Sequence, residues 1–478
     1  MKAKLLIVMF LCFCKTLALS QTTLYYVKKN GAIGDGKHDD YLAIQKTLDQ
    51  AKSTKNSTVI LEEGKNYIIS KPLKVNSNFN GNTSTIIPKS SQALSIYTSN
   101  VNIENLNITG ANFQYMRLDV NGIKIKNCKF TTKSYFVLLS INGDNISIEN
   151  SILINEFKNE RSFAIHSTSG ISNFQSIGNK ISGGILFKND SLKNSKNFII
   201  SNNEISVNYS NIPSSVKIQN DAVTFTSISD VKIFNNNFIL NDVNRGFKIT
   251  DKGKYVGKML NVSNKLPDNY TFKNNTIIAN SKNGKQLFDF YIGTKNVSFI
   301  ENNITASGFT TLFENKTKLN IGKRTFTLNN NTINFDSEIM YFDGYGKNSD
   351  EQNNIVITNN TLNYTSNKFK FKTQRVGQNN DVKFNFIFNI RNVDVFTYQN
   401  NKFFDKNSSL NFANRYFFYI QNPIKADISN SNYKGGIKYD AIRKNSNMTY
   451  KNNINMETKF KKAILVDPNN KVNFQLIQ

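Results

Sequence analysis

The chain has 478 residues and a formal net charge of +26, from 60 Lys and Arg against 34 Asp and Glu. The chain has two His, three Cys and no Trp. The His and Cys are too few to supply the ligands of a His-based zinc site or of a zinc ribbon, so both are excluded. A Ser-His-Asp triad would have to use His38 or His166, and no nucleophile-elbow motif lies near either. Asparagine is the outlier of the composition, with about 78 residues.

The first 20 residues have the pattern of an export signal. Two lysines precede an apolar stretch (LLIVMFLCF), and small residues follow it near Ser20. That stretch is too short to span a membrane, and no later segment is long enough. We therefore expect a secreted, extracellular or periplasmic protein that keeps only Cys128 and, once Lys2, Lys4 and Lys15 are removed, carries a charge of +23.

One short phrase, apolar-x-apolar-x-Asn-x-x-apolar, recurs about a dozen times at spacings of roughly 21 to 39 residues. Clear copies are VNIENLNI (101–108), ISIENSIL (146–153), YTFKNNTI (270–277) and FTLNNNTI (326–333). Each copy predicts two short strands of alternating polarity, broken at an Asn-rich bend. A strand pair this short cannot bury its own apolar face, so we expect the copies to stack on one another.

A third short strand lies between successive copies, as in SFAIH, GILFK, GFKIT and LFDFY. Three strands per turn predict an all-β chain, a single right-handed parallel β-helix of about a dozen coils. An Asn at the same bend of every coil forms a ladder of side-chain amides and tolerates left-handed backbone. We expect the export signal at 1–20, an N-terminal cap at 21–56, the β-helix at 57–460 and a C-terminal cap or tail at 461–478.

The segment 25–51 predicts a strand, a Gly/Asp turn and an amphipathic helix. Leu42, Ile44, Leu48 and Ala51 supply the apolar side of that helix, and two acidic residues favour its N-terminus. The first coil of a stack leaves an open core and an open sheet edge, so we expect the helix to cover it.

The stretch NGAIGDG (30–36), followed by DD at 39–40 and AIQ at 43–45, resembles the opening of pectate-lyase-like right-handed β-helix proteins. In that superfamily this stretch forms the N-terminal cap, and the members include polysaccharide hydrolases, polysaccharide lyases and phage tailspikes. With the repeats, the resemblance covers most of the chain; it implies the fold and leaves the reaction open. The chain departs from polygalacturonases, because it has NDA (220–222) in place of an Asp pair and no Gly-His-Gly, and it lacks the Glu-x-Asp of ι-carrageenases.

The third strand of each coil is expected to form the floor of a substrate groove, with large apolar residues inward and alternate positions outward. This phase turns four charged residues outward: Lys248, Asp289, Glu314 and Asp343. Successive coils stack about 4.8 Å apart, so these four side chains are expected to form one vertical file. In that file Asp289 lies one coil from Glu314 and two coils from Asp343. These spacings approach those of retaining and inverting glycosidases, so the first expectation is hydrolysis by paired carboxylates with Lys248 beside them.

The same face supplies the residues expected to contact the substrate, which are His166, Arg245, Tyr291, Tyr341 and Arg391. A lyase would instead take its base from Lys, Arg, His or Tyr on this face, with a cation neutralising a substrate carboxylate. No dense acidic cluster argues for a metal, so no cofactor is expected, although a single outward Asp group leaves calcium binding open.

The positive charge of an exported protein favours an anionic partner. The first hypothesis is a secreted, monomeric glycoside hydrolase that cleaves a uronate-containing or sulfated polysaccharide. The alternatives are a polysaccharide lyase and a non-catalytic glycan-binding or adhesin-like β-helix. A nucleic-acid partner is not expected, because the chain is exported and shows no recognised nucleic-acid module.

Overall fold

The computed structural model describes most of the chain from residue 22 onward. The export signal expected at 1–20 lies outside the described residues. The described residues are 22–158, 161–189, 193–210, 212, 220–250, 254–256, 259–261, 267–291, 294–317, 323–344, 352–365, 374–375, 383–405, 415–421, 425–434, 439–443, 447–451, 453, 464–466 and 473–477.

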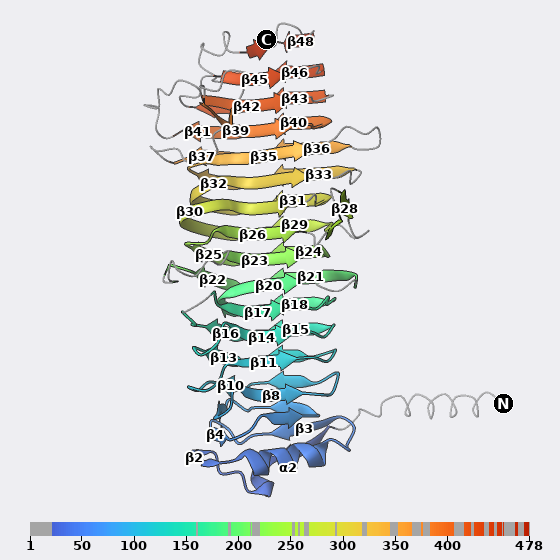
Figure 1. Ribbon diagram of the computed structural model, residues 1–478, viewed down its shortest axis with the longest axis vertical. Helices are drawn as coiled ribbons and strands as arrows, with labels where there is room; N and C mark the ends of the chain where they lie inside the picture. The colour runs from blue at the N-terminus through green and yellow to red at the C-terminus, as the bar shows by residue number, and fades with distance from the viewer. Residues whose placement is uncertain are drawn as a thin grey trace, which may run out of the picture.

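The described residues form a right-handed parallel β-helix, with one α-helix among them at its N-terminal end (Figure 1). Its strands stack along one long axis, so each coil lies between the coils that precede and follow it in sequence. The fold predicted from the repeats and the N-terminal motif is therefore confirmed. Within the described residues, no helix is long and apolar enough to cross a membrane.

A typical coil carries three strands, one on each of three faces that we call A, B and C. In the described part of the chain, face A is a sheet of 17 strands. They are β1 (Thr23–Tyr26), β3 (Ser57–Ile60), β6 (Asn78–Asn80), β9 (Asn102–Glu104), β12 (Lys124–Lys126), β15 (Ile146–Glu149), β18 (Phe174–Ile177), β21 (Ser195–Ser201), β24 (Ile228–Phe234), β29 (Tyr270–Lys273), β31 (Asn296–Ile300), β33 (Arg324–Asn329), β36 (Asn353–Thr358), β40 (Val395–Gln399), β43 (Lys425–Ser429), β46 (Asn447–Lys451) and β48 (Asn473–Ile477).

Faces B and C belong to one 29-stranded sheet, because the long strands β30 (Thr276–Tyr291) and β32 (Asn303–Thr317) run across both. The other strands of face B are β2 (Asp35–Asp39), β4 (Asn66–Ile69), β7 (Thr85–Pro88), β10 (Asn107–Ile108), β13 (Lys129–Thr132), β16 (Ile152–Asn155), β19 (Lys180–Ser182), β22 (Glu204–Asn208), β25 (Asn237–Asn241), β34 (Thr332–Phe335), β37 (Thr361–Tyr364), β41 (Lys402–Asp405) and β44 (Asn432–Lys434).

Face C carries the third strand of each coil, on which the candidate site residues were expected. Its other strands are β5 (Leu73–Val75), β8 (Gln92–Ile96), β11 (Tyr115–Leu118), β14 (Val137–Ile141), β17 (Phe163–Ser167), β20 (Gly184–Lys188), β23 (Asp221–Thr226), β26 (Arg245–Thr250), β35 (Glu338–Gly344), β39 (Lys383–Arg391), β42 (Arg415–Gln421), β45 (Tyr439–Arg443) and β47 (Ile464–Val466). Outside the stack, β27 (Lys254–Val256) and β28 (Met259–Asn261) form a hairpin, and β38 (Gln374–Arg375) pairs antiparallel with β39.

A glycine allows β32 to turn from face B to face C. Gly308 has a φ of +78°, and its N–H donates to the carboxylate of Asp336. A Cβ at this position would overlap the main-chain oxygen of Ser281, so no side chain fits. Glycine also adopts this left-handed backbone without the steric penalty of other residues.

The bend marked by the repeat phrase has the left-handed backbone that its asparagines predicted. Asn105, Asn150 and Asn274 all have a φ near +50°. The residue after this bend faces the core and builds a ladder of buried amides, which runs through Asn179, Asn203, Asn236, Asn275, Asn302, Asn331, Asn360 and Asn401. Each bond of the ladder joins one coil to the next and so holds the coils in register.

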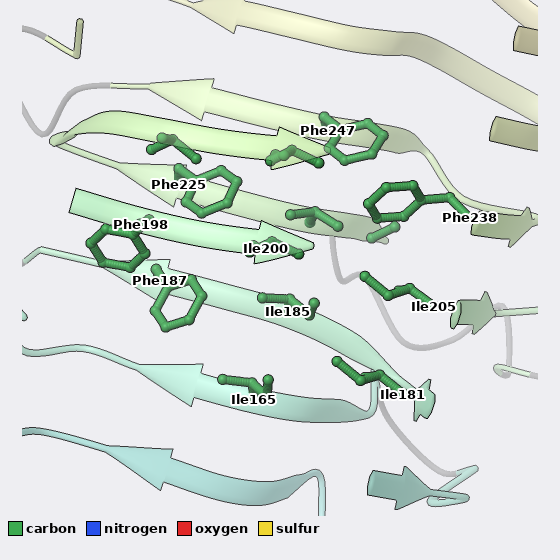
Figure 2. Packing of buried hydrophobic residues seen from close by; sticks show 14 of the residues in the cluster. Ile165, Ile181, Ile185, Phe187, Phe198, Ile200, Ile205, Phe225, Phe238 and Phe247 are labelled. Atoms are coloured by element: carbon green, nitrogen blue, oxygen red, sulfur yellow. The ribbon is translucent and has the colours of Figure 1, made fainter. Parts of the chain in front are cut away.

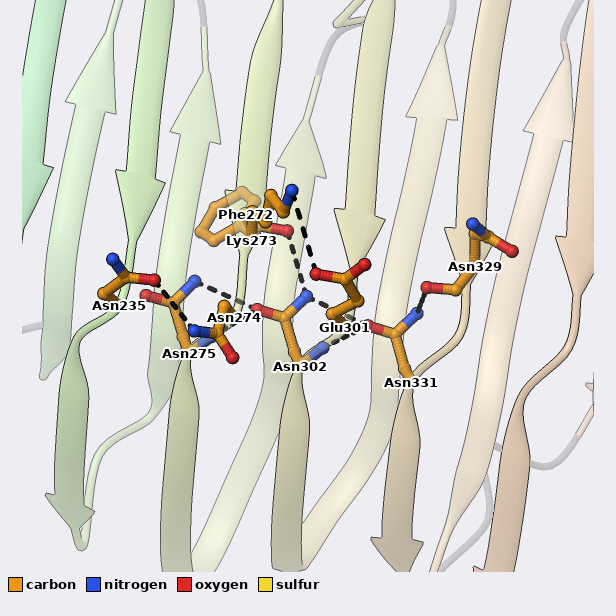
Figure 3. A network of polar contacts seen from close by, with 9 residues as sticks. All are labelled: Asn235, Phe272, Lys273, Asn274, Asn275, Glu301, Asn302, Asn329 and Asn331. Carbon is orange, nitrogen blue, oxygen red and sulfur yellow. Dashed lines mark hydrogen bonds and ion pairs between the residues drawn. The ribbon is translucent and has the colours of Figure 1, made fainter.

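Asn302 shows how one rung of this ladder is made (Figure 3). Its main-chain N and its Nδ2 each donate to Oδ1 of Asn331 at 2.9 Å, and its Nδ2 also donates to the carbonyl of Phe272 at 2.9 Å. Its own Oδ1 accepts from the main-chain N and the Nδ2 of Asn275 at 3.0 Å. Buried amides are stable in a core only when hydrogen-bonded, and this arrangement provides the partners.

The core is a column of aliphatic and aromatic side chains (Figure 2). The rings of Phe247, Phe288 and Phe313 stack in successive coils, with centroids 4.8 and 5.1 Å apart. Burying each such ring stabilises the fold by roughly 1.5–3 kcal/mol. The inward phase predicted for these residues is therefore correct. Cys128 also lies inside; it is a free thiol whose pKa burial raises to about 12.

Helix α2 (Tyr41–Ala51) lies at the N-terminal end of the stack, next to the first coil, as predicted (Figure 1). It follows a short 3-10 helix, η1 (Val27–Asn30). Ile44 and Leu48 are fully buried, whereas Leu42 is 78% exposed. Leu42 therefore does not belong to the apolar side of the helix, because at 3.6 residues per turn a residue two positions before Ile44 points to the opposite side.

The stack extends beyond the residues expected to bound it. Strand β1 pairs in parallel with β3, so pairing begins at Thr23 rather than at 57. At the other end β48 pairs with β46, so the strands continue to Ile477. The 17 strands of face A also exceed the dozen coils expected from the repeats.

Candidate active site

Three of the predicted charged residues align on the outward side of face C. Lys248 on β26 is the register partner of Asp289 on β30, and Asp289 is the partner of Glu314 on β32. Neighbouring strands of a sheet lie about 4.8 Å apart. The three side chains therefore form a vertical file over three successive coils.

Asp343 lies outside this file. The residue aligned with Glu314 is Tyr341, whereas Asp343 aligns with Lys316. Asp343 is thus two positions farther along its strand. The predicted file of four charges holds only three, because an outward phase does not determine the register between two coils.

A second outward file runs three positions earlier along the same strands. Leu287 and Phe288 are both fully buried, so the strand turns two consecutive residues toward the core. Consequently Gln286 and Asp289, on either side of that pair, both face outward. The second file comprises Asp221, Arg245, Gln286, Thr311 and Glu338.

Arg245 joins the two files. One guanidinium nitrogen, Nη1, lies 3.2 Å from Oδ1 of Asp221, and Nε lies 2.7 Å from Oδ2 of Asp289. Lys248 places its Nζ 3.7 Å from the other oxygen of Asp221. Because these side chains are largely buried, the ion pairs fix the two carboxylates on their coils.

Glu314 has a donor at each of its carboxylate oxygens. Nε2 of Gln286 donates to Oε2 at 2.8 Å, and Nζ of Lys316 forms an ion pair with Oε1. The residue is only 4% exposed. Since an ionised carboxylate only accepts hydrogen bonds, two donors at these oxygens suit the ionised form of Glu314.

The environment of Asp289, unlike that of Glu314, favours the protonated form. Burial raises the pKa of Asp289 to about 6, and the charge of Glu314 raises it as well, while Arg245 and Lys248 lower it. A carboxyl group with this pKa keeps part of its population protonated near neutral pH. Crowded carboxylates in different surroundings divide in this way into an acid and a base.

Tyr341 and Arg391, both predicted to contact the substrate, lie on the coils after Glu314. The ring of Tyr341 is 5% exposed, with Nζ of Lys316 at 4.6 Å and the guanidinium of Arg391 at 5.8 Å from its centroid. Its hydroxyl lies 3.4 Å from Oδ2 of Asp343. Tyr341 thus holds Lys316 beside Glu314 rather than presenting an open face for a sugar.

His166 shares the outward file but lies three coils before Lys248. The pKa of His166 is lowered to about 4, first by burial and then by the charges of Arg161 and Lys188. The imidazole is therefore neutral at neutral pH. The structure places this predicted contact about 19 Å from Asp289, at four strand spacings.

The side chain of Tyr291 lies outside the described residues, although its main chain pairs with that of Lys316. Sequence reasoning missed Asp221, Gln286 and Lys316. Strict alternation assigns Gln286 to the core, because it has the parity of Phe288. The signal that could have found it is the pair of consecutive apolar residues at 287–288, which shifts the outward phase by one position.

The arrangement brings a proton donor and an ionised carboxylate to adjacent coils. Asp289 can deliver a proton, and Glu314 can act as a base or a nucleophile. Among the residues that the structure describes, no group of three or more His, Cys, Asp or Glu is placed to hold a metal ion.

No protein-family model and no curated protein matches this chain. Solved structures are similar to it in fold. A mutant tailspike protein of E. coli bacteriophage HK620, in complex with a pentasaccharide, is 10% identical, with 87% of this chain and 76% of the tailspike covered and a TM-score of 0.48. The surface adhesin PfbA of Streptococcus pneumoniae is 13% identical, with coverages of 90% and 91% and a TM-score of 0.36. The A-module of the mannuronan C-5 epimerase AlgE6 of Azotobacter vinelandii is 12% identical, with coverages of 90% and 98% and a TM-score of 0.36.

Proposed function

We propose that this chain is an exported glycoside hydrolase that cleaves an anionic polysaccharide on the outer side of face C. The observation that carries the proposal is the contrast between two register partners. Asp289 has a pKa raised to about 6, whereas Glu314 has a donor at both oxygens. One carboxyl group is suited to give a proton and the other to remain charged, which is what glycosidic cleavage requires of its carboxyl pair.

The spacing of the pair favours a retaining reaction. Register partners on adjacent strands are about 4.8 Å apart, close to the 5–5.5 Å between the carboxyl groups of retaining glycosidases. Asp289 would protonate the glycosidic oxygen while Glu314 attacks the anomeric carbon. Water would then release the sugar from Glu314, with Asp289 now accepting the proton. Arg245 and Gln286 would orient the two carboxyl groups.

The charge of the chain supports an anionic substrate. The whole chain carries +26, and on face C cationic residues such as Lys316 and Arg391 flank the carboxyl pair. A field of this sign concentrates a polyanion near the protein.

One observation favours a second candidate function, glycan binding without catalysis. Asp289 and Glu314 are each only 4% exposed, and both are already engaged with side chains of the protein. In a purely binding β-helix, such pairs would only stabilise the face. The two candidates differ in whether the bound polymer is cut.

The test is incubation of the purified protein with polygalacturonate, alginate, chondroitin sulfate and a sulfated galactan. New reducing ends without the ultraviolet absorbance of unsaturated uronates are the expected result. Reducing ends accompanied by that absorbance would replace the hydrolase with a lyase. If a polymer binds but no new reducing ends form, the protein is a glycan-binding protein and not a hydrolase.

A further inference from the structure

Asp221 lies on the outer side of face C, two coils before Asp289, and the proposed reaction assigns it no role. It is the first residue of β23 and the register partner of Arg245 on β26. The side chain of Asp221 is only 3% exposed, and that of Arg245 is 13% exposed. Charges buried this deeply act on one another strongly, because water screens them little. Asp221 therefore constrains where the charge of Arg245 is placed.

Arg245 lies on the coil between the two acids and reaches each of them with a different nitrogen. Nη1 donates a hydrogen bond to Oδ1 of Asp221 at 3.2 Å. Nε lies 2.7 Å from Oδ2 of Asp289, a distance that would allow a hydrogen bond, yet Nε has no hydrogen-bond partner among the described residues. Its N–H is therefore not aligned with that oxygen. The guanidinium is hydrogen-bonded to Asp221 and only close to Asp289.

This difference in alignment matters for a carboxyl group that has to carry a proton. A guanidinium binds a carboxylate most strongly through aligned, charge-assisted hydrogen bonds, and such bonds favour the ionised form of the carboxylate. A general acid must instead be protonated before it can react. Because Nη1 is held by Asp221, the guanidinium of Arg245 cannot rotate freely to align its N–H groups with Asp289.

The charged groups around Asp289 come from the coils on both sides of it. They are Arg245 and Lys248 on β26, Asp221 on β23, Glu314 and Lys316 on β32, and Glu338 and Asp343 on β35. Burial and Glu314 raise the pKa of Asp289, whereas Arg245 and Lys248 lower it. Asp221 lies within ion-pair distance of both of these cations. Removing the charge of Asp221 would therefore leave both cations to act more strongly on Asp289.

We propose that Asp221 is a positioning residue for the general acid: it holds Arg245 out of an aligned pair with Asp289, so that Asp289 can carry the proton that it delivers. The role of Asp289 as an acid rests on the proposed function, whereas the control of Arg245 by Asp221 does not. Asp221 acts through Arg245, and needs no contact with the substrate.

The experiment follows the protonation of Asp289 directly, in the full chain and without substrate. The aspartate carboxyl carbons are labelled with carbon-13, and the NMR signal of Asp289 is the one that Asp289→Asn loses. Asp221→Asn keeps the size of the side chain and removes its charge. It is expected to lower the pKa of Asp289 from about 6 by about one, the lower end of the effect of a neighbouring opposite charge. Asp221→Ser should act in the same direction, so the test does not depend on one variant.

The matched control is Asp119→Asn. Asp119 also pairs with an arginine of face C, since its Oδ2 lies 2.8 Å from Nε of Arg117. Arg117 belongs to the same outward file as Asp289, but six coils before it. Six strand spacings amount to about 29 Å, well beyond the Debye length of about 10 Å at 0.1 M salt. Asp119→Asn should therefore leave the pKa of Asp289 unchanged.

A double-mutant cycle shows whether Asp221 acts through Arg245. In Arg245→Met, the further change Asp221→Asn should move the pKa of Asp289 much less than it does in the parent. An equal movement in both backgrounds would overturn the positioning role, because the charge of Asp221 would then act without Arg245. The proposal is also overturned if Asp221→Asn moves this pKa no more than Asp119→Asn does.

Catalysis provides a second, independent readout. On a polymer that the parent cleaves, the falling limb of kcat/KM should move to lower pH in Asp221→Asn. Above pH 6 the rate should drop about tenfold, because the protonated fraction of an acid falls tenfold when its pKa falls by one. If the parent cleaves nothing, or if the pKa of Asp289 moves and the limb does not, the hydrolase proposal fails and the control of Asp289 by Asp221 stands.

Discussion

Nε of Arg245 lies 2.7 Å from Oδ2 of Asp289, yet the pKa of Asp289 is raised to about 6. A neighbouring guanidinium ordinarily holds the pKa of a carboxyl group down. Here burial outweighs it, Glu314 adds to the increase, and Arg245 divides its charge between Asp289 and Asp221. The ion pair therefore orients Asp289 without restricting it to the ionised form, and a general acid needs that combination.

Neutralising either member of the carboxyl pair should abolish most of the activity. Asp289→Asn and Glu314→Gln are each expected to lower turnover about 10²-fold or more, the usual scale for an acid–base group. The control is Glu301→Gln, which removes an exposed acid at a bend outside the site and should retain full turnover. Initial rates of reducing-end release measure all three. Near-full activity of both Asp289→Asn and Glu314→Gln would reject the assignment.

The pH dependence of kcat/KM should report the protonation of Asp289. Because the acid form is the active one, the rate should fall as the pH rises through about 6. Arg245→Met removes a charge that lowers this pKa, so the falling limb should move to higher pH. A limb that stays in place in Arg245→Met would contradict the role of Asp289 as the acid.

Asp289 and His166 should affect stability with opposite signs as the pH changes. The pKa of Asp289 is raised by folding, from 3.8 to about 6, so its stabilising contribution is complete below pH 4 and is lost as the pH rises through 6. The pKa of His166 is lowered from 6.5 to about 4, so its contribution is complete above pH 6.5 and is lost as the pH falls through 4. Between pH 4 and 6 the two changes oppose each other.

Melting temperatures of the parent, Asp289→Asn and His166→Gln between pH 4 and 7 test this. Relative to the parent, Asp289→Asn should gain stability as the pH rises, and His166→Gln should gain stability as the pH falls. Differences that do not vary with pH would show that neither group titrates as described.

The repeat phrase contained most of the information on the fold. A period of two identifies strands, and an Asn at a fixed place identifies a left-handed bend. Asn274 occupies that bend with a φ of +52°, whereas in the next coil Glu301 occupies it with a φ of +57°, and Asn302 is the buried residue that follows. Leu42 was misplaced because it stands two residues before Ile44, a spacing that puts the two side chains on opposite sides of a helix. The number of coils was underestimated because coils without a clear Asn phrase, such as those at β6 and β48, escape a search for it.

The site could be predicted from the sequence only where inward and outward residues alternate strictly along a strand. Asp289 and Glu314 align because each follows an equivalent pair of buried residues, at 287–288 and at 312–313, so their shared phase also gives their register. Asp343 was placed wrongly because register between coils depends on the length of the intervening turns. Gln286 was missed because the strand departs from alternation at Leu287, and its bond to Glu314 arises only between coils.

Salt should weaken the affinity for an anionic polymer. If the positive surface binds the substrate, affinity for the cleaved polyanion should fall steeply between 50 and 500 mM salt, because exposed charges are screened over a Debye length of about 10 Å at 0.1 M. Carboxyl-reduced polymer is the matched control. Isothermal titration at several salt concentrations measures the slope, and an affinity independent of salt would remove the argument for an anionic substrate.

The asparagine ladder should be a main source of stability along the axis. In Asn302→Ala, the main-chain N and Nδ2 of Asn275 lose their acceptor and the carbonyl of Phe272 loses a donor. Each buried group left without a partner costs about 1–3 kcal/mol, so a loss on the order of 3 kcal/mol is expected. The control is Asn303→Ala, one residue along the chain, where the side chain is exposed and the change should stay within about 0.5 kcal/mol.

The position of the loss distinguishes the ladder from a general effect of a core substitution. Each coil contacts only its neighbours, so hydrogen-exchange protection should fall first in the strands next to Asn302, namely β29, β31 and β33, and remain high near α2. Denaturant unfolding gives the size of the loss, and exchange gives its place. Equal effects of Asn302→Ala and Asn303→Ala would mean that stacking of the core rings, and not the amide ladder, holds the coils together.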